Sequence, residues 1–314
     1  MDNTWITGLA SIALEVADLE RSTTFYTQAW GLAQVGEASG RRFFRCAQGA
    51  PVALSLRQGR RARFESITLQ ARDAAAVQSL HARLAGEPVV RILAAPGLLS
   101  DEPGKDYGMV FEGPQGLRIV VAVAAAAAPM THATDPTRPL SLTHVVLNSA
   151  DMPQLSAFFT RVLGLSLSDR TDRMDFLRCG ADHHTVALAH GNALSLNHAA
   201  FEMRDIDSIM YGTGRLLDHG YVVEWGLGRH GPGNNVFSYF VDPDGFAVEY
   251  TTEMEQVGED YEPHFADYWS AFPRRPCRWG VARKPSERMM RAMAGAAETC
   301  LQANRTPLQA GIQP

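Results

Sequence analysis

Residues 228–250 of this 314-residue chain read GRHGPGNNVFSYFVDPDGFAVEY. A loop rich in Gly, Pro and Asn runs into an apolar, aromatic strand, and Asp-Pro-Asp-Gly predicts a tight turn into a second strand. This hairpin places His230 near the mouth of the loop, Tyr239 on the first strand and Glu249 on the second. Three titratable side chains then share one largely apolar sheet. Such groups are costly to bury unless something pairs with them, and a metal ion is one such partner.

Most of the chain is an internal repeat. Residues 9–31 match residues 142–164 at a constant shift, residues 66–73 match 198–205, and residues 111–116 match 240–245. Each copy predicts a strand, a helix, short strands, another strand, a second helix and a final pair of strands. The four helices are predicted from apolar residues at helical spacing, at 18–30, 74–84, 151–163 and 206–219. The predicted fold class is therefore α+β.

The two copies differ in their polar residues. The second copy carries His144, His198 and Glu249, each in a segment that reads as a strand. The aligned residues of the first copy are poor or incapable ligands: Ser11, Ser66 and Val120. Taken alone, a histidine on an apolar strand is more often structural. Two histidines and one carboxylate together form a set that leaves open coordination positions and is typical of non-haem Fe(II) oxygen chemistry. We therefore expect a metal site in the second copy and a scaffold in the first.

The repeat predicts an N-terminal module without metal ligands at 1–123, a linker at 124–140 and a metal-binding catalytic module at 141–254. A C-terminal extension at 255–314 is aromatic at first and then predicts one amphipathic helix from Ser286 to about Gln302. We expect its aromatic side chains to pack onto the modules, with a substrate lid as the alternative, and its last dozen residues to be disordered.

Composition excludes some classes of function. A net charge of −5 gives no support for nucleic-acid binding, and the longest apolar stretch is too short to cross a bilayer. The N-terminus does not read as a secretory signal. Four sparse cysteines lack CxxC spacing, which favours reduced thiols in a cytoplasmic protein: Cys46, Cys179, Cys277 and Cys300.

The second half resembles the type I extradiol ring-cleavage dioxygenases of the vicinal oxygen chelate (glyoxalase/bleomycin resistance/dioxygenase) superfamily. The resemblance rests on Gly-x-His, an aromatic strand with a tyrosine, and Asp-Pro-x-Gly followed by Glu. These positions are Gly228, His230, Tyr239, Asp242, Pro243, Gly245 and Glu249. Ser238 departs from the pattern, which has an apolar residue there. The resemblance implies two tandem modules of paired βαβββ repeats, each a half-open mixed β-barrel, with the metal in the second.

The resemblance also implies roles for single residues. His144, His198 and Glu249 would hold Fe(II), with Mn(II) as an alternative, and O2 would be the co-substrate. An acid–base histidine would come from the adjacent pair His183 and His184. Neighbouring residues on a strand face opposite ways, so only one can serve. The family pattern favours His183.

A substrate-binding set is implied in the same way. His230 and Tyr239 would orient the diol and take part in catalysis. Asn234, or its neighbour Asn235, would order the loop beside the substrate.

The expected function is extradiol (meta) cleavage of a catechol-type diol, with incorporation of both atoms of O2, in aromatic-compound degradation. The expected partner is a small aromatic diol, without nucleic acid or membrane, in a homo-oligomer. Three alternatives stay open: a dioxygenase for a trihydroxylated or bicyclic aromatic, a glyoxalase- or epimerase-like enzyme that uses its metal as a Lewis acid, and a non-enzymatic protein that binds aromatic ligands.

Overall fold

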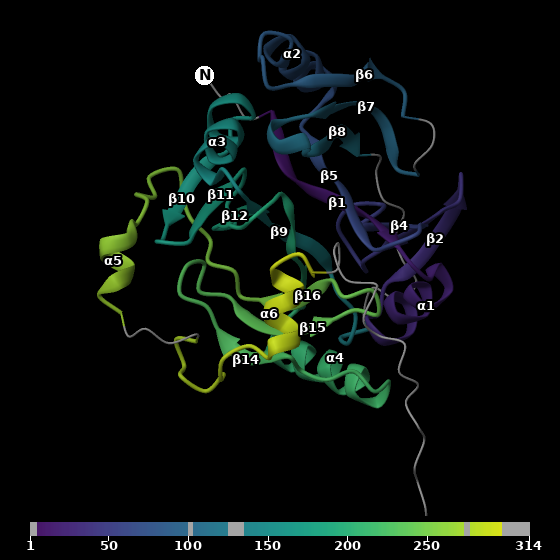
Figure 1. Ribbon diagram of the computed structural model, residues 1–314, viewed down its shortest axis with the longest axis vertical. Helices are drawn as coiled ribbons and strands as arrows, with labels where there is room; N and C mark the ends of the chain where they lie inside the picture. Colours follow the sequence, from purple (N-terminus) through teal and green to yellow (C-terminus); the bar gives the residue numbers. More distant parts are fainter. Residues whose placement is uncertain (1–4, 100–102, 125–134, 273–276, 297–314) are drawn as a thin grey trace, which may run out of the picture.

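The computed structural model describes residues 5–99, 103–124, 135–272 and 277–296, which fold into two eight-stranded mixed sheets (Figure 1). The strand order is β2-β3-β4-β1-β5-β8-β7-β6 in the first sheet and β10-β11-β12-β9-β13-β16-β15-β14 in the second. The two orders are the same when each sheet is counted from its own first strand. This confirms the predicted α+β fold of tandem βαβββ repeats.

The strands of the first sheet are β1 (Ile6–Val16), β2 (Ala33–Ala38), β3 (Arg41–Arg45), β4 (Leu54–Gln58), β5 (Arg63–Ala71), β6 (Arg91–Gly97), β7 (Lys105–Glu112) and β8 (Arg118–Ala124). Those of the second are β9 (Ser141–Ser149), β10 (Ser166–Arg170), β11 (Met174–Arg178), β12 (Val186–His190), β13 (Ser195–Glu202), β14 (Trp225–Arg229), β15 (Val236–Val241) and β16 (Ala247–Thr252).

All four predicted helices are present. They are α1 (Leu19–Thr24), α2 (Ala74–Leu84), α3 (Met152–Ala157) and α4 (Ile206–Asp218). The helices α1 and α3 each continue into a π-helical turn, over Phe25–Ala29 and Phe158–Val162.

Each helix begins after an aspartate whose carboxylate accepts a hydrogen bond from a free backbone N–H of the first turn. These residues are Asp18, Asp73, Asp151 and Asp205. The repeat therefore preserves the signal that starts its helices.

The predicted hairpin is formed by β15 and β16, and its turn docks on the first half of the chain. The carboxylate of Asp242 accepts a hydrogen bond from the Tyr26 hydroxyl at 2.8 Å. The corresponding turn of the first half docks the other way, since the side-chain oxygen of Gln115 accepts from the Ala150 N–H at 3.1 Å. Gly245 closes the hairpin turn at φ +94°, a backbone conformation that favours glycine. The repeats thus hold each other through reciprocal turns.

The strand register pairs the expected ligand positions of the second sheet in the same way as the corresponding positions of the first sheet. Ala200 on β13 lies between two expected ligands, opposite His144 on β9 and opposite Glu249 on β16. The residues that flank the corresponding position of the first sheet carry no strong ligand: Ser11 and Val120.

The C-terminal extension contributes α5 (Ala266–Ser270), which lies at the outer edge of the second half near β10, and α6 (Glu287–Met293), which packs on the second sheet over β15 and β16 (Figure 1). The helix α6 begins after Ser286 as predicted; the rest of its predicted length, the last dozen residues and most of the linker lie outside the described residues. The domain boundaries stay predictions.

Three cysteines are free in the part of the chain that the structure describes: Cys46, Cys179 and Cys277. No helix among the described residues is long and apolar enough to cross a membrane.

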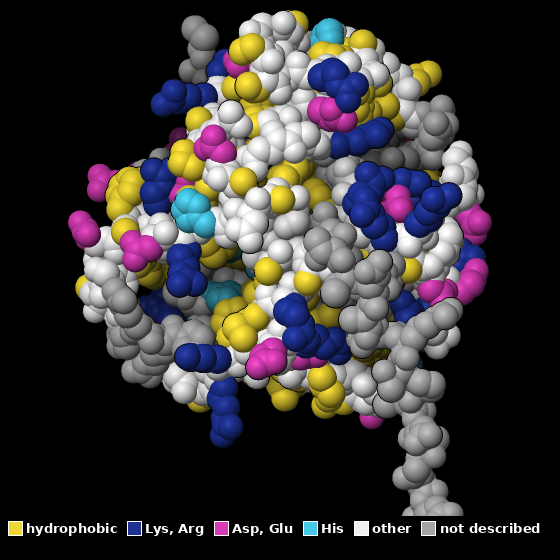
Figure 2. Space-filling model, in the orientation of Figure 1, with side chains coloured by type: hydrophobic (Ala, Val, Ile, Leu, Met, Phe, Trp, Pro, Cys, Tyr) yellow, Lys and Arg dark blue, Asp and Glu magenta, His cyan; other side chains and the backbone are white. Residues whose placement is uncertain are grey.

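Basic side chains gather on the first sheet around two half-buried acids (Figure 2). Arg57 and Arg63 contact the Glu15 carboxylate at 2.7 and 3.2 Å, and Arg41 contacts Glu65 at 2.6 Å. These pairs neutralise much of the basic cluster of residues 57–63, in keeping with the interpretation that it is not a nucleic-acid patch.

Candidate metal centre

His144, His198 and Glu249, called the triad below, lie on the adjacent strands β9, β13 and β16. Adjacent strands are about 4.8 Å apart, so side chains on one face of these three strands meet. One ligand atom from each residue lies within 4.8 Å of the other two. All three side chains are buried, with exposed fractions of 2%, 6% and 0%.

The triad is not held together by hydrogen bonds. Glu249 Oε2 lies 3.4 Å from His144 Nε2 and 3.2 Å from His198 Nε2, yet it has no hydrogen-bond partner among the described residues. The other oxygen, Oε1, accepts a bond of 3.3 Å from Asn235 Nδ2. Three donor atoms therefore converge on a common point.

A chain of amides fixes the tautomer of His198. Asn148 Nδ2 donates to the Met293 carbonyl at 2.7 Å, and Asn148 Oδ1 accepts from Asn197 Nδ2 at 3.0 Å. The Asn197 oxygen then faces His198 Nδ1 at 2.8 Å and can only accept a hydrogen. His198 therefore carries its hydrogen on Nδ1, and its bare Nε2 lone pair faces Glu249.

The charges of the triad call for a cation. Burial lowers the pKa of His198, so its imidazole is neutral at neutral pH. A lone pair and a carboxylate oxygen 3.2 Å apart repel each other unless a positive charge lies between them. Two imidazoles and a carboxylate fit a divalent metal ion, and hydrogen bonds from the second nitrogen of each imidazole are typical of such sites.

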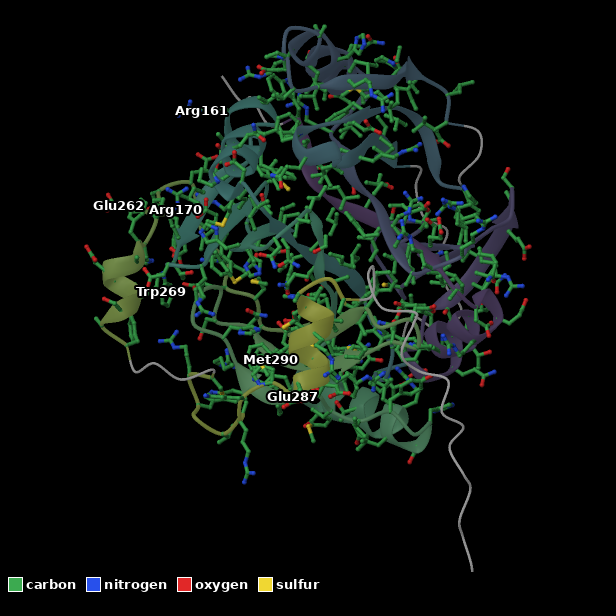
Figure 3. All side chains as sticks on the ribbon, viewed as in Figure 1. Arg161, Arg170, Glu262, Trp269, Glu287 and Met290 are labelled. Atoms are coloured by element: carbon green, nitrogen blue, oxygen red, sulfur yellow. The ribbon has the colours of Figure 1, made fainter. Side chains whose placement is uncertain are left out.

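The two histidines of the triad line a cavity of about 920 Å³. The cavity is also lined by Val146, Phe176 and Trp225 and by Trp269 of the extension. Trp269 points from α5 toward the second sheet (Figure 3), and its ring lies against Gly231, where a Cβ atom would be 3.3 Å from the ring. A hollow with a histidine side chain inside is visible on the face shown in Figure 2. The extension therefore forms part of the cavity wall.

His230 and Tyr239 reach the edge of the triad, where they were expected. His230 Nε2 lies 2.9 Å from Tyr239 Oη, and Tyr239 Oη lies 3.5 Å from His198 Nε2. Burial lowers the pKa of His230 to about 4 and raises the pKa of Tyr239 well above its ordinary value. At neutral pH the imidazole is neutral and the phenol keeps its proton.

The structure places the adjacent histidines differently from the expectation. His184 lines the cavity, and its ring centroid is 4.4 Å from that of His144. His183 is fully buried and turns away, with Nε2 3.0 Å from Asp169 Oδ2. The backbone bends at His183 and Thr185 and becomes a strand only at Val186, and only one of the two side chains faces the cavity. His184 is therefore the residue beside the triad.

Of the two adjacent asparagines, Asn235 and not Asn234 lines the cavity. Asn234, expected to contact substrate, has φ +50° and is not among the residues that line the cavity; its side-chain oxygen accepts from Arg278 Nη1 at 3.2 Å. Asn235 is buried, lines the cavity and donates to Glu249 and, at 2.8 Å, to Thr251 Oγ1. The left-handed backbone conformation of Asn234 turns the loop so that the side chain of Asn235 faces the site.

Several residues of the site were not identified from the sequence. Asn148 and Asn197 orient a triad histidine, and Trp225 and Trp269 form cavity walls. An asparagine next to His198 on a predicted strand was the only local signal, because the other contacts join distant segments.

Comparisons with known proteins show what the chain is similar to. Residues 141–250 match the family model of the Glyoxalase/Bleomycin resistance protein/Dioxygenase superfamily. Metapyrocatechase 2 of Cupriavidus necator is 34% identical over 122 residues, 38% of each chain. Biphenyl-2,3-diol 1,2-dioxygenase of Metapseudomonas furukawaii is 25% identical over 82% of this chain and 89% of its own. The chain spans less than half the length of several curated relatives that it matches.

One solved structure is similar over nearly the whole chain. It is the Mn(II)-bound glyoxalase from Novosphingobium aromaticivorans, which is 34% identical, with a TM-score of 0.82, over 91% of this chain and 94% of that one. Together with the family match and the shared strand order of the two sheets, this similarity shows that the chain belongs to the Glyoxalase/Bleomycin resistance protein/Dioxygenase superfamily.

Proposed function

We propose that this protein is an extradiol dioxygenase that cleaves the ring of an aromatic diol and incorporates both atoms of O2. The observation that carries the proposal is that one cavity is lined by both triad histidines together with His184, His230 and Tyr239. The triad supplies ligands and leaves positions open for a diol and for oxygen. Relatives named as catechol and biphenyl-diol dioxygenases support the same chemistry.

We propose that His144, His198 and Glu249 hold the metal, and that it is Fe(II). A redox-active divalent ion supplies the means of reacting a diol with triplet oxygen and lowers the pKa of the hydroxyl groups that bind to it. The same donors suit Mn(II), which the similar glyoxalase contains.

The remaining polar groups of the cavity can bind the diol and move its protons. The neutral His230 can accept a proton at Nε2, and the protonated Tyr239 can donate a hydrogen bond to a diol oxygen. His184 faces the cavity beside His144 and is in place to serve the oxygen side of the reaction. Phe176 and Trp225 exclude water and hold an aromatic ring.

The size of the cavity favours a substituted or two-ring diol. Its volume of about 920 Å³ lies near the upper end of the range of about 300–1,000 Å³ for ligand sites. We propose that the substrate carries a bulky substituent. From its membership of the superfamily, we also propose that the protein is a cytoplasmic homo-oligomer.

A second candidate is a glyoxalase-type reaction in which the metal acts only as a Lewis acid. The name of the similar Mn(II)-bound structure favours it. The two candidates differ in their need for oxygen.

An oxygen electrode tests the proposal. Protein reconstituted anaerobically with Fe(II) is mixed with catechol, 3-methylcatechol and 2,3-dihydroxybiphenyl, and His198→Ala serves as the control. We expect one O2 consumed per diol, together with a yellow ring-cleaved product, and neither with the variant. Metal-loaded protein that consumes no oxygen with any of the three diols, but isomerises the glutathione adduct of methylglyoxal, would favour the second candidate.

A further inference from the structure

Behind the cavity lies a buried carboxylate that the proposed reaction does not use. Asp169 on β10 is 1% exposed, and its Oδ2 lies 3.0 Å from His183 Nε2. Its Oδ1 accepts from the His264 backbone N–H at 2.8 Å and from the Tyr261 hydroxyl at 3.2 Å. The ring nitrogen His264 Nδ1 also lies 3.2 Å from Oδ1. Oδ2 of Asp169 therefore faces His183, whereas Oδ1 faces groups of the C-terminal extension.

The two histidines are linked to each other as well. His183 Nδ1 lies 3.1 Å from His184 Nδ1, so one of these atoms must donate a hydrogen and the other must accept it. A carboxylate only accepts, so the His183 nitrogen that faces Asp169 carries a hydrogen. When His183 is neutral with its hydrogen on Nε2, its Nδ1 is bare, and the shared hydrogen then belongs to His184 Nδ1.

We propose that Asp169 is a positioning residue that fixes the tautomer of the cavity histidine through His183. The order of bonds is His184 Nδ1–H to His183 Nδ1, and His183 Nε2–H to Asp169. His184 then presents its bare Nε2 to the cavity. In its neutral form it accepts a proton or a hydrogen bond there, and it donates one only after it has been protonated. This chemical consequence rests on the proposed function, whereas the tautomer itself does not.

The C-terminal extension takes part in this arrangement. Tyr261 and His264 belong to it, and the Arg170 N–H donates to the His264 carbonyl at 2.8 Å, beside Asp169. The donors from the extension all go to Oδ1 and so hold Oδ2 toward His183. The extension therefore fixes the orientation of the carboxylate and, through it, the chemistry presented in the cavity.

Asp169→Asn is the sharpest perturbation, because Oδ1 of the asparagine would keep the donors from the extension. Its NH2 group would then face His183 Nε2 and donate to it, so His183 would carry its hydrogen on Nδ1 and donate to His184 Nδ1. The variant is expected to invert both tautomers and to place a hydrogen on His184 Nε2. Asp175→Asn is the matched control, because Asp175 is equally buried but pairs with Arg170 and contacts no histidine in the described residues.

Long-range ¹⁵N–¹H NMR of ¹⁵N-histidine-labelled, Zn(II)-substituted protein measures the tautomers directly, since Zn(II) is diamagnetic. The signals are assigned with His183→Gln and His184→Gln. We expect Nδ1–H at His184 in the wild type and in Asp175→Asn, and Nε2–H in Asp169→Asn. Wild-type protein with Nε2–H at His184, or Asp169→Asn with unchanged tautomers, would overturn the proposal. The wild-type spectrum alone decides the matter if Asp169→Asn does not fold.

Kinetics of the Fe(II)-loaded protein add a second readout. Acid–base groups in place contribute about 10²–10⁴-fold to rate. Asp169→Asn should therefore lower kcat by about 10²–10⁴-fold with KM and metal content within a few-fold of the wild type, while Asp175→Asn should not. If the wild type consumes no oxygen with any diol, the proposed function fails, and the NMR result still decides the tautomer.

Discussion

Replacing Glu249 with glutamine should stabilise the metal-free protein and reduce the stabilisation that a bound metal provides. In the wild type, Glu249 is fully buried, and its Oε2 faces the Nε2 atoms of two imidazoles without a hydrogen bond from any described residue. An unsatisfied buried acceptor costs about 1–3 kcal/mol, and more when it is charged. The glutamine has nearly the same shape, removes the charge, and can donate a hydrogen to the bare Nε2 of His198.

The metal-free Glu249→Gln protein should therefore be more stable than the metal-free wild type by about 1–3 kcal/mol. For domains of 150–250 residues this corresponds to a rise in Tm of roughly 2–4 °C per kcal/mol. Metal at about 100 times its Kd should add about 2.7 kcal/mol to the wild type and far less to the variant, which has lost one ligand and the only carboxylate of the triad.

Differential scanning calorimetry in EDTA and in Mn(II) measures both effects. Glu202→Gln is the matched control, because Glu202 lies exposed at the end of β13 and bonds to Ser141 at 2.7 Å. It should shift neither value by a comparable amount. A metal-dependent rise in Tm equal to that of the wild type would remove Glu249 from the ligand set. A metal-free variant less stable than the wild type would refute the idea that this carboxylate is unsatisfied without a cation.

Three further predictions follow from single features of the structure. His184→Phe should retain metal and diol but lower kcat by about 10²–10⁴-fold in stopped-flow assays; full turnover would exclude it from the reaction. In metal-free protein, the unfolded chain should bind a proton at His230 between pH 6.5 and about 4 that the folded protein does not bind, because burial lowers the folded pKa to about 4. The free energy of unfolding should therefore decrease as the pH is lowered through this window, by up to about 1.4 kcal/mol per pH unit. A slope that is no shallower in His230→Gln would contradict this. Gly214→Ala, which meets no atom within 4 Å in α4, should stabilise by about 0.5–1 kcal/mol in urea unfolding. Gly212→Ala should destabilise, because its Cβ would lie 2.8 Å from the Tyr250 ring; equal effects of the two changes would contradict the packing argument.

The features predicted correctly depend on local sequence or on the repeat. The aspartates that start the helices and the Asp-Pro-Asp-Gly turn act over a few residues, so their effect is visible in the sequence. The meeting of His144, His198 and Glu249 was predicted because the repeat assigned each of them to a strand with a counterpart in the other copy.

The features placed wrongly depend on backbone detail at strand ends. The family pattern favoured His183, but the structure turns His184 into the cavity, with bends in the backbone before Val186. In the same way, a positive φ at Asn234 directs Asn235 to the triad. Neither irregularity has a distinct signature in the residue types.

Contacts between distant segments were beyond prediction for a different reason. Tyr261 and His264 of the extension reach Asp169, which is more than 90 residues earlier in the chain, and Trp269 forms a wall of the cavity. Aromatic composition indicated that the extension packs onto the modules. It could not indicate which buried group the extension would meet.

The most direct test of the account is the fate of labelled oxygen. Fe(II)-loaded protein and a diol are mixed under ¹⁸O2, the reaction is quenched rapidly, and the product is analysed by mass spectrometry, with His198→Ala as the control. The account predicts a ring-cleaved product that carries two labelled atoms, and unreacted diol with the variant. A diol left intact by the metal-loaded wild type, or a cleaved product that contains no labelled oxygen, would contradict it.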